Sequence, residues 1–351
     1  MSDDVGPDQI EGRPHPRETS SFIGRPAAER EFLDAYRLGR LHHAWILGGP
    51  EGVGKATLAY RIARFLLAHP KPRNASVQMA RDLFVDPSHP AAVAVAKQKH
   101  QDLRVLRRGL NEKTGKPQTE IPVADVRDAI AMFHETALNE SWRICIVDAA
   151  EDLNRSSANA LLKTLEEPPE QSILLLVSHA PDRLLPTIRS RCRRLDLGPL
   201  SPDDLRQILA DLGEDDVDAV AAAVAEARGS VRRALALLDP ELASMGKRTR
   251  AMLDKLPDLA PDALMDLASR STGRDGEVFF GEVLDAVRGW LSGIVAEEAG
   301  GAAARVEPFA EIWEKLHEGA RMIEAYNVDR RPFIVGLFSD MADAFARLRA
   351  S

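Results

Sequence analysis

The pattern of apolar and polar positions changes once along the chain, near residue 199. Before that point, short apolar runs alternate with stretches in which apolar residues recur every three or four positions. The short runs predict buried strands, and the longer spacing predicts amphipathic helices. Regular alternation of the two predicts an α/β domain built on a parallel sheet. We expect strands at residues 44–47, 103–106, 143–147, 172–177 and 194–197, with helices that include 56–67 and 124–136.

The second part of the chain carries almost no strand signal. It opens on Ser201-Pro202-Asp203-Asp204, a sequence typical of a helix start. The remainder shows helical spacing, and Asp239-Pro240 divides it into a short and a long part. We therefore predict four segments. They are a flexible N-terminal segment (1–19), an α/β domain (20–198), a three-helix domain (199–241) and an all-helical C-terminal domain (242–351), with a loop at Gly300-Gly301.

Composition narrows the class of protein. The chain has 351 residues, of which 44% are hydrophobic and 28% charged, as in a globular protein of more than one domain. The chain contains no run of 18 apolar residues, so no membrane span is predicted. The N-terminus also lacks the apolar stretch of a secretory signal. The two cysteines, Cys145 and Cys192, supply neither a disulfide framework nor a four-cysteine zinc site. These features favour a cytoplasmic protein.

The net charge of −8 argues against general nucleic-acid binding. Any contact with DNA is therefore expected to be local, or to be supplied by partner proteins. A protein that binds nucleic acid by itself remains an alternative, which a gel-shift experiment with the isolated chain would test.

The sharpest motif is a glycine-rich loop that follows the first predicted strand and opens a helix. Its glycines, Gly49, Gly52 and Gly54, allow backbone N–H groups to surround a phosphate, and Lys55 would reach the outer phosphates. The residue after the lysine is Ala56, whereas P-loops place a magnesium-binding hydroxyl there. Thr57 is displaced by about 100° around the helix. The loop suits ATP or ADP but has lost a metal ligand; an ordinary glycine-rich turn is the alternative.

An apolar strand that ends in Asp148 has the form of a Walker B motif, whose aspartate holds Mg²⁺ in P-loop NTPases. An acid that orients the attacking water is expected next, but Ala149 and Ala150 occupy those positions. Glu151 is too distant to replace it without a bulge. The missing hydroxyl and the missing acid are two separate defects, so we expect weak or no ATPase activity.

The next stretch carries a family resemblance. Residues 157–169 read SANALLKTLEEPP, with a buried-face spacing at Ala158, Leu161, Leu162 and Leu165. A strand ending in Ser178 follows, and then Ser190-Arg191-Cys192. Together with the two nucleotide motifs, these residues resemble the clamp-loader family of bacterial AAA+ proteins. The resemblance extends over about the first 240 residues.

The resemblance implies a role for individual residues. Arg191 matches the arginine finger that acts in trans on a neighbouring subunit's ATP, although a surface arginine paired with an acid is the plainer alternative. Ser178 matches sensor 1, and Arg232 in Gly229-Ser230-Val231-Arg232 matches sensor 2, for which an exposed arginine on a capped helix is an equal alternative. The helical domains would be a lid and a collar.

Within this family, loss of both catalytic positions with Ser-Arg-Cys retained is similar to the delta-prime, or stator, type of subunit. That resemblance implies a hetero-oligomeric ring with motor subunits and a delta subunit, which loads the sliding clamp on primer–template DNA. The ring belongs to the DNA polymerase III holoenzyme, a DNA-directed nucleotidyltransferase. The alternative is an active AAA+ ATPase of the motor type, in which Thr57 replaces the missing hydroxyl and another acidic residue replaces the missing acid.

One segment departs from many family members. They carry a four-cysteine zinc module after the P-loop helix, whereas residues 68–100 here contain no cysteine. The four prolines of this segment predict a loop with a short helix. We expect no zinc, and neither the pair His89 and His100 nor the pair His42 and His43 is predicted to bind a metal.

Overall fold

A computed structural model describes residues 13–109, 118, 120–134, 141–272, 276–298, 303–326 and 328–350. The chain divides into two compact units, Met1–Ala234 and Leu235–Ser351. Within the described residues, no helix combines the length and the apolar character needed to cross a membrane.

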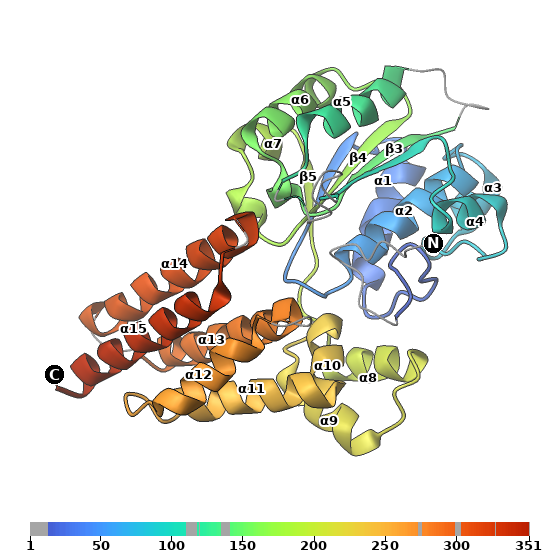
Figure 1. Cartoon of the computed structure of the whole chain (residues 1–351). Helices are drawn as coiled ribbons and strands as arrows, with labels where there is room; N and C mark the ends of the chain where they lie inside the picture. The colour runs from blue at the N-terminus through green and yellow to red at the C-terminus, as the bar shows by residue number, and fades with distance from the viewer. Residues whose placement is uncertain are drawn as a thin grey trace. The chain divides into compact units, whose positions relative to one another are not determined.

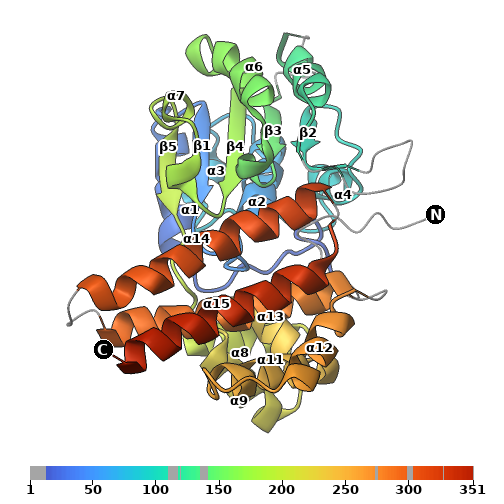
Figure 2. The ribbon, with the colours of Figure 1, turned by 60° about the vertical axis from the view of Figure 1, so that its left-hand side comes forward.

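A five-stranded parallel sheet forms the centre of the first unit (Figure 1), and its strands lie in the order β2-β3-β4-β1-β5 (Figure 2). Its presence confirms the predicted α/β fold with a parallel sheet. Each observed strand lies within one residue of its predicted bounds. The strands are β1 (Ala44–Gly48), β2 (Leu103–Leu106), β3 (Arg143–Val147), β4 (Ser172–Ser178) and β5 (Arg193–Asp196).

Helices cover both faces of this sheet (Figures 1 and 2). Side chains of β1 alternate between the two faces, so that Trp45 and Leu47 join one apolar cluster while Ala44 and Ile46 join the other. Burial on both faces explains why the central strands read as continuous apolar runs. The helices on the Trp45 side are α1 (Pro26–Arg37), α2 (Lys55–Ala68), α3 (Ala75–Met79) and α4 (Pro90–Ala96); those on the Ala44 side are α5 (Val123–Ala131), α6 (Arg155–Glu166) and α7 (Pro186–Arg189).

Two helical predictions in this unit need correction. The helix expected at 124–136 ends as α5 at Ala131, and a 3₁₀ turn, η1 (Met132–His134), replaces its last turn; residues 135 and 136 lie outside the described residues. The segment 68–100 holds two short helices, α3 and α4, rather than one. His89 caps α4, because its Nδ1 accepts a hydrogen bond from Ala91 N at 3.2 Å.

The described part of the predicted flexible N-terminal segment, residues 13–19, is packed against other parts of the first unit. His15 is only 2% exposed, and its ring meets Tyr60 edge-on at 5.7 Å. Arg13 Nη1 donates to Leu212 O at 2.9 Å, and Arg64 Nη2 donates to Thr19 O at 2.6 Å. Many of these contacts go to backbone carbonyls, so they leave no periodic signal in the sequence.

A small helical bundle completes the first unit. It comprises α8 (Pro202–Asp211), α9 (Val217–Glu226) and the start of α10 (Val231–Leu238), which spans the division between the units. Ser201 caps α8, as its hydroxyl accepts from Asp204 N at 3.1 Å, and Asp216 caps α9 in the same way.

In the described residues, the second unit contains the end of α10 and the helices α11 (Pro240–Leu253), α12 (Pro261–Arg270), α13 (Gly276–Glu298), α14 (Ala303–Tyr326) and α15 (Arg330–Ala350). The long helices α14 and α15 run beside one another (Figure 2). The apolar row of α13 faces the core of this unit, since Val283, Val287 and Leu291 are fully buried and Phe279 packs beside them. The predicted loop at Gly300-Gly301 lies outside the described residues.

Candidate functional site

The glycine-rich loop joins the end of β1 to the start of α2, as the sequence predicts. Gly49, Gly52 and Gly54 have φ angles of +135°, +73° and +95°, which favour glycine over residues with a side chain. A Cβ atom added to Gly49 would overlap Leu197 O. The loop is therefore a backbone cradle of the kind that suits a phosphate.

Lys55 is buried at the first position of α2, with 3% of its surface exposed. Its Nζ atom donates to Gly49 O at 2.8 Å and to Pro50 O at 2.6 Å. The ammonium group thus lies inside the loop, against the loop's own carbonyls. This places a positive charge where outer phosphates of a nucleotide would be held.

The position after the lysine offers no ligand to magnesium. Ala56 is a buried alanine without a hydroxyl, and Thr57 follows it on the same helix. The residues of the loop therefore fit the phosphates of ATP or ADP, but position 56 does not supply the hydroxyl that usually binds the metal.

Asp148 directly follows β3 and is 3% exposed. Its backbone N donates to Leu106 O at 2.7 Å, which continues the pairing of β3 with β2. The next residue, Ala149, has a φ of 62°, and the chain then enters a 3₁₀ turn, η3 (Ala150–Asp152). No carboxylate follows Asp148 at either of the next two positions.

Sequence reasoning missed the partner of Ser178. The hydroxyl of this residue, the last of β4, donates to Glu151 Oε1 at 2.5 Å, and Ala180 N donates to the same oxygen at 2.6 Å. The η3 turn thus directs the Glu151 carboxylate to the end of β4. Its second oxygen, Oε2, is buried and accepts no hydrogen bond from the described residues. The only signal in the sequence was an acid three positions after the Walker B aspartate.

Arg191 lies in the turn after α7, with 36% of its side chain exposed. Its Nη2 atom is 2.9 Å from Glu166 Oε1, and its Nη1 atom donates to Thr187 O at 3.0 Å. The structure thus contains the acid pairing that was the plainer alternative. One-third exposure still leaves the guanidinium group accessible to an outside partner.

The nearby arginines bind other acids. Arg193 pairs with Glu31 and lies over the Trp45 ring, 4.7 Å from its centre, whereas Arg189 and Arg194 both contact Asp182. Arg191 therefore differs from its neighbours in contacting an acid of the α6 helix.

Arg232 stands at the second position of α10 and reaches the P-loop. Its Nη1 atom lies 3.2 Å from Glu51 Oε1. In addition, Val231 N donates to Gly52 O at 2.9 Å. Ser230 meanwhile accepts from Arg233 N at 3.2 Å, so the helix is also capped. The predicted sensor 2 residue and the predicted nucleotide loop are thus adjacent.

The cysteines are not reactive groups. Burial raises the pKa of Cys145 and of Cys192 to about 12 in each case. Both thiols are therefore protonated near neutral pH, when they are poor nucleophiles and poor metal ligands.

His42 and His43 make structural contacts. The His42 and His43 rings stack with 4.4 Å between centres, and His43 Nε2 hydrogen-bonds Leu165 O at 3.0 Å. Burial lowers the pKa of His43, and proximity to His42 lowers it further.

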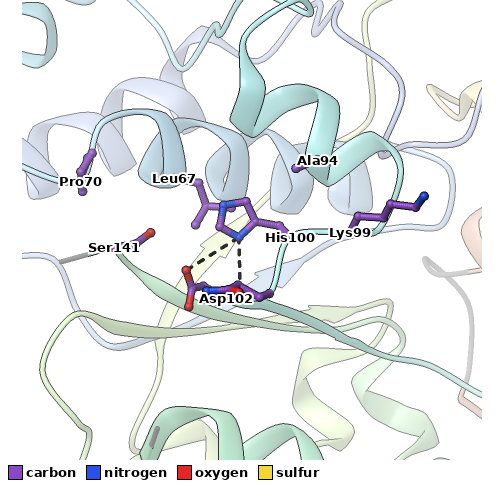
Figure 3. Close-up of a pocket in the computed structure, with 8 residues that line it drawn as sticks. Leu67, Pro70, Ala94, Lys99, His100, Asp102 and Ser141 are labelled. Atoms are coloured by element: carbon purple, nitrogen blue, oxygen red, sulfur yellow. Dashed lines mark hydrogen bonds and ion pairs between the residues drawn. The ribbon is translucent and has the colours of Figure 1, made fainter. Parts of the chain in front are cut away.

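Figure 3 shows His100 in a pocket with Leu67, Lys99 and Ser141. Its Nδ1 atom accepts from Asp102 N at 3.3 Å, and burial lowers the pKa of this histidine. Among the residues that the structure describes, no three His, Cys, Asp or Glu side chains are grouped for a metal ion.

Comparison with protein families gives one match that spans half of the chain. The family described as "DNA polymerase III, delta subunit" matches residues 24–201, which include the P-loop, Asp148, Ser178 and Arg191. These residues extend from just before α1 to the cap of α8.

Individual relatives carry more than one subunit name. A DNA polymerase III subunit gamma from Buchnera aphidicola is 30% identical over 229 residues, 64% of this chain and 58% of the relative. A DNA polymerase III subunit delta' from Pseudomonas aeruginosa is 38% identical over 151 residues, 43% of this chain and 41% of the relative. Each match thus spans less than two thirds of the relative's length. A solved gamma subunit-related protein from Thermotoga maritima covers 89% of this chain and 99% of its own, at 15% identity and a TM-score of 0.40.

Proposed function

The chain belongs to the clamp-loader AAA+ family of DNA polymerase III subunits, and we propose that within this family it is the delta-prime, or stator, subunit. In this role it helps to load the sliding clamp on primed DNA. It supplies Arg191 to the ATP site of a neighbouring motor subunit and hydrolyses little or no ATP itself.

One combination of residues carries the proposal. Arg191 stays accessible in the turn after α7, while the chain's own P-loop has Ala56 at the metal-ligand position and Ala149 after Asp148. A subunit of this kind can supply an arginine to the ATP site of a neighbour, but its own ATP site lacks the metal ligand and the acid needed for hydrolysis. Relatives named gamma and delta' both match the chain, so the choice between subunit types depends on these positions.

The chemistry of the finger follows from the guanidinium group. Its planar donors match the oxygens of a phosphate, and its positive charge stabilises the negative charge that develops during phosphoryl transfer. Such a residue contributes about 10³–10⁵ in rate in other NTPases. Glu166 would hold the Arg191 side chain in place through Nη2, while the remaining guanidinium donors contact the phosphate oxygens of the neighbour.

The P-loop of this chain would contribute binding rather than hydrolysis. Lys55 and the glycine backbone would hold nucleotide phosphates, and Arg232 would contact them from α10. With no hydroxyl at position 56 and no acid at position 149, neither a metal nor an attacking water would be positioned. The partners would be motor subunits and a delta subunit in one ring, with the sliding clamp and primer–template DNA bound through the assembly.

Reconstitution tests the proposal. Motor subunits, a delta subunit and the clamp are combined on primed DNA, with this chain or without it, and loaded clamps are counted. We expect loading only when the chain is present, and a ring in which it appears beside the motor subunits. Equal loading in its absence would contradict the stator role.

A second candidate function, an active ATPase of the motor type, has one observation in its favour. Glu151 lies near the end of the Walker B strand, binds Ser178 and keeps one buried carboxylate oxygen without a hydrogen bond from the described residues. Magnesium-dependent ATP turnover by the isolated chain, lost in Glu151→Gln, would favour this function over the stator.

A further inference from the structure

An acidic residue lies inside the phosphate-binding loop. Glu51 stands between Pro50 and Gly52, and its Oε1 atom is 3.2 Å from Arg232 Nη1. From this contact we infer that Glu51 is a specificity-determining residue of the P-loop, which competes with nucleotide phosphates for Arg232 and so weakens the binding of nucleoside di- and triphosphates. This inference rests on the proposed binding of nucleotide phosphates by the P-loop, and it is independent of any action of Arg191 on a neighbour.

The start of α10 rests directly on the loop. Val231 N donates to Gly52 O at 2.9 Å, and a Cβ atom added to Gly52 would overlap Ser230 Oγ. The φ angle of Gly52, +73°, also favours glycine. Close packing of backbone on backbone therefore holds Arg232 within reach of Glu51.

A second connection holds the helical bundle against the other side of the loop. Arg25 Nη2 donates to Gly198 O at 2.6 Å, where the chain leaves the sheet, and to Val53 O at 3.3 Å. Leu200 N donates to Gly229 O at 3.0 Å, and this hydrogen bond joins the residue before α8 to the turn before α10. Contacts within the protein thus hold the bundle against the P-loop.

The charges of the loop explain the expected effect on ligands. Lys55, Arg25 and Arg232 are basic residues placed at the loop, and Glu51 contacts the last of them. An incoming phosphate must displace the carboxylate from Arg232 and also meets its like charge. Both the carboxylate and the guanidinium are about half exposed, at 52% and 45%, so an ion can exchange there. The competition acts on outer phosphates, and a nucleoside monophosphate, which has none, should escape it.

Titration calorimetry of the full chain with ADP and with AMP tests this inference. We expect Glu51→Gln to bind ADP more tightly than wild type by about fivefold, the size of an exposed ion pair. AMP affinity should not change. In an Arg232→Ala background, the gain from Glu51→Gln should fall well below fivefold, because no arginine is released. Thermal melting of each variant establishes that it is folded.

Glu31→Gln is the matched control, since it removes one charge from another exposed pair, that with Arg193. An equal gain in ADP affinity in this control would overturn the inference, because net charge alone would explain it. An equal gain from Glu51→Gln with and without Arg232 would overturn it too. So would a Glu51→Gln variant that binds ADP no better than wild type, including the case in which neither binds.

Discussion

The carboxylate of Glu166 and the guanidinium of Arg191 lie 2.9 Å apart, which joins the last residue of α6 to the turn after α7. The carbonyl end of a helix favours a positive charge, so α6 adds to this attraction. One residue earlier, Leu165 O is held by His43 Nε2. The C-terminal end of α6 thus positions the Arg191 side chain.

We expect Glu166→Gln to lower the ATP turnover of the assembled loader without unfolding the chain. The substitution weakens the contact that orders Arg191, and ordering a side chain costs about 0.5–1.5 kcal/mol, or about two- to tenfold in rate at the adjoining site. Steady-state turnover measures the effect, with Glu31→Gln as the control for loss of an exposed pair. Equal rates for all three chains would argue against a supporting role.

Restoring both missing groups should restore activity to the isolated chain. Ala56→Thr supplies the metal-binding hydroxyl, and Ala149→Glu supplies the acid after Asp148. We predict that the double variant shows magnesium-dependent ATP turnover at least about tenfold above the background measured with wild type, since each group is needed in the transition state. The gain is limited because Ala149 has a φ of 62°, where a larger residue is strained. Turnover in wild type equal to the double variant would show that the two defects do not matter.

Glu151 should stabilise the first unit through its contacts with β4. Glu151→Ala leaves Ser178 Oγ and Ala180 N without their acceptor, and a buried donor that loses its partner costs about 1–3 kcal/mol. Urea unfolding should therefore show a lower midpoint. Ser178→Ala removes only one of the two donors and should cost less. A Glu151→Ala chain as stable as wild type would contradict these contacts.

Acid should destabilise the first unit through His43. Burial lowers the pKa of this histidine in the folded protein, so the unfolded chain binds a proton first as the pH falls. The stability is complete above the unfolded pKa, about 6.5, and is lost as the pH falls below it toward the folded value. We expect His43→Gln to reduce the slope of stability between pH 7 and pH 5. The histidines His69 and His100 also have lowered pKa values and leave part of the slope in place. An unchanged slope in His43→Gln would contradict the assignment.

The core of the second unit should depend on the buried row of α13. Leu291→Ala removes a fully buried side chain and should lower the free energy of unfolding by about 2–5 kcal/mol. Val278→Ala, at a side chain 56% exposed on the same helix, should change it by less than about 0.5 kcal/mol. Chemical denaturation of the two variants side by side makes the comparison. Similar losses would mean that the row does not face the core.

The local pattern of apolar and polar residues was sufficient to predict much of the fold. Strands such as β1 and β4 could be placed because each is a short apolar run, buried on both sides. The signal is weaker for β5, which reads Arg-Arg-Leu-Asp and is buried only at Leu195. The P-loop was predictable because its glycines and Lys55 are adjacent in sequence. The last turn of α5 was misplaced, since helical spacing continues through the 3₁₀ turn at Met132–His134.

Pairs that are distant in sequence could not be predicted. Glu151 and Ser178 are 27 residues apart, and their contact depends on the turn at Ala149 and on the adjacency of β3 and β4. The pair Glu51 and Arg232 and the pair Glu166 and Arg191 also join residues that are distant in sequence. Charge alone could not identify these pairs, because the chain contains many other acids and arginines. The packing of residues 13–19 was missed because much of it is made by backbone carbonyls.

The central claim is tested most directly by ATP turnover, measured for the isolated chain and for loaders assembled with wild type or with Arg191→Ala. Arg189→Ala is the control, because its side chain contacts Asp182 in the same region. The account predicts no turnover by the isolated chain, a full rate with Arg189→Ala, and a lower rate with Arg191→Ala in an intact ring. Turnover by the isolated chain, together with an unchanged rate for the Arg191→Ala loader, would contradict it.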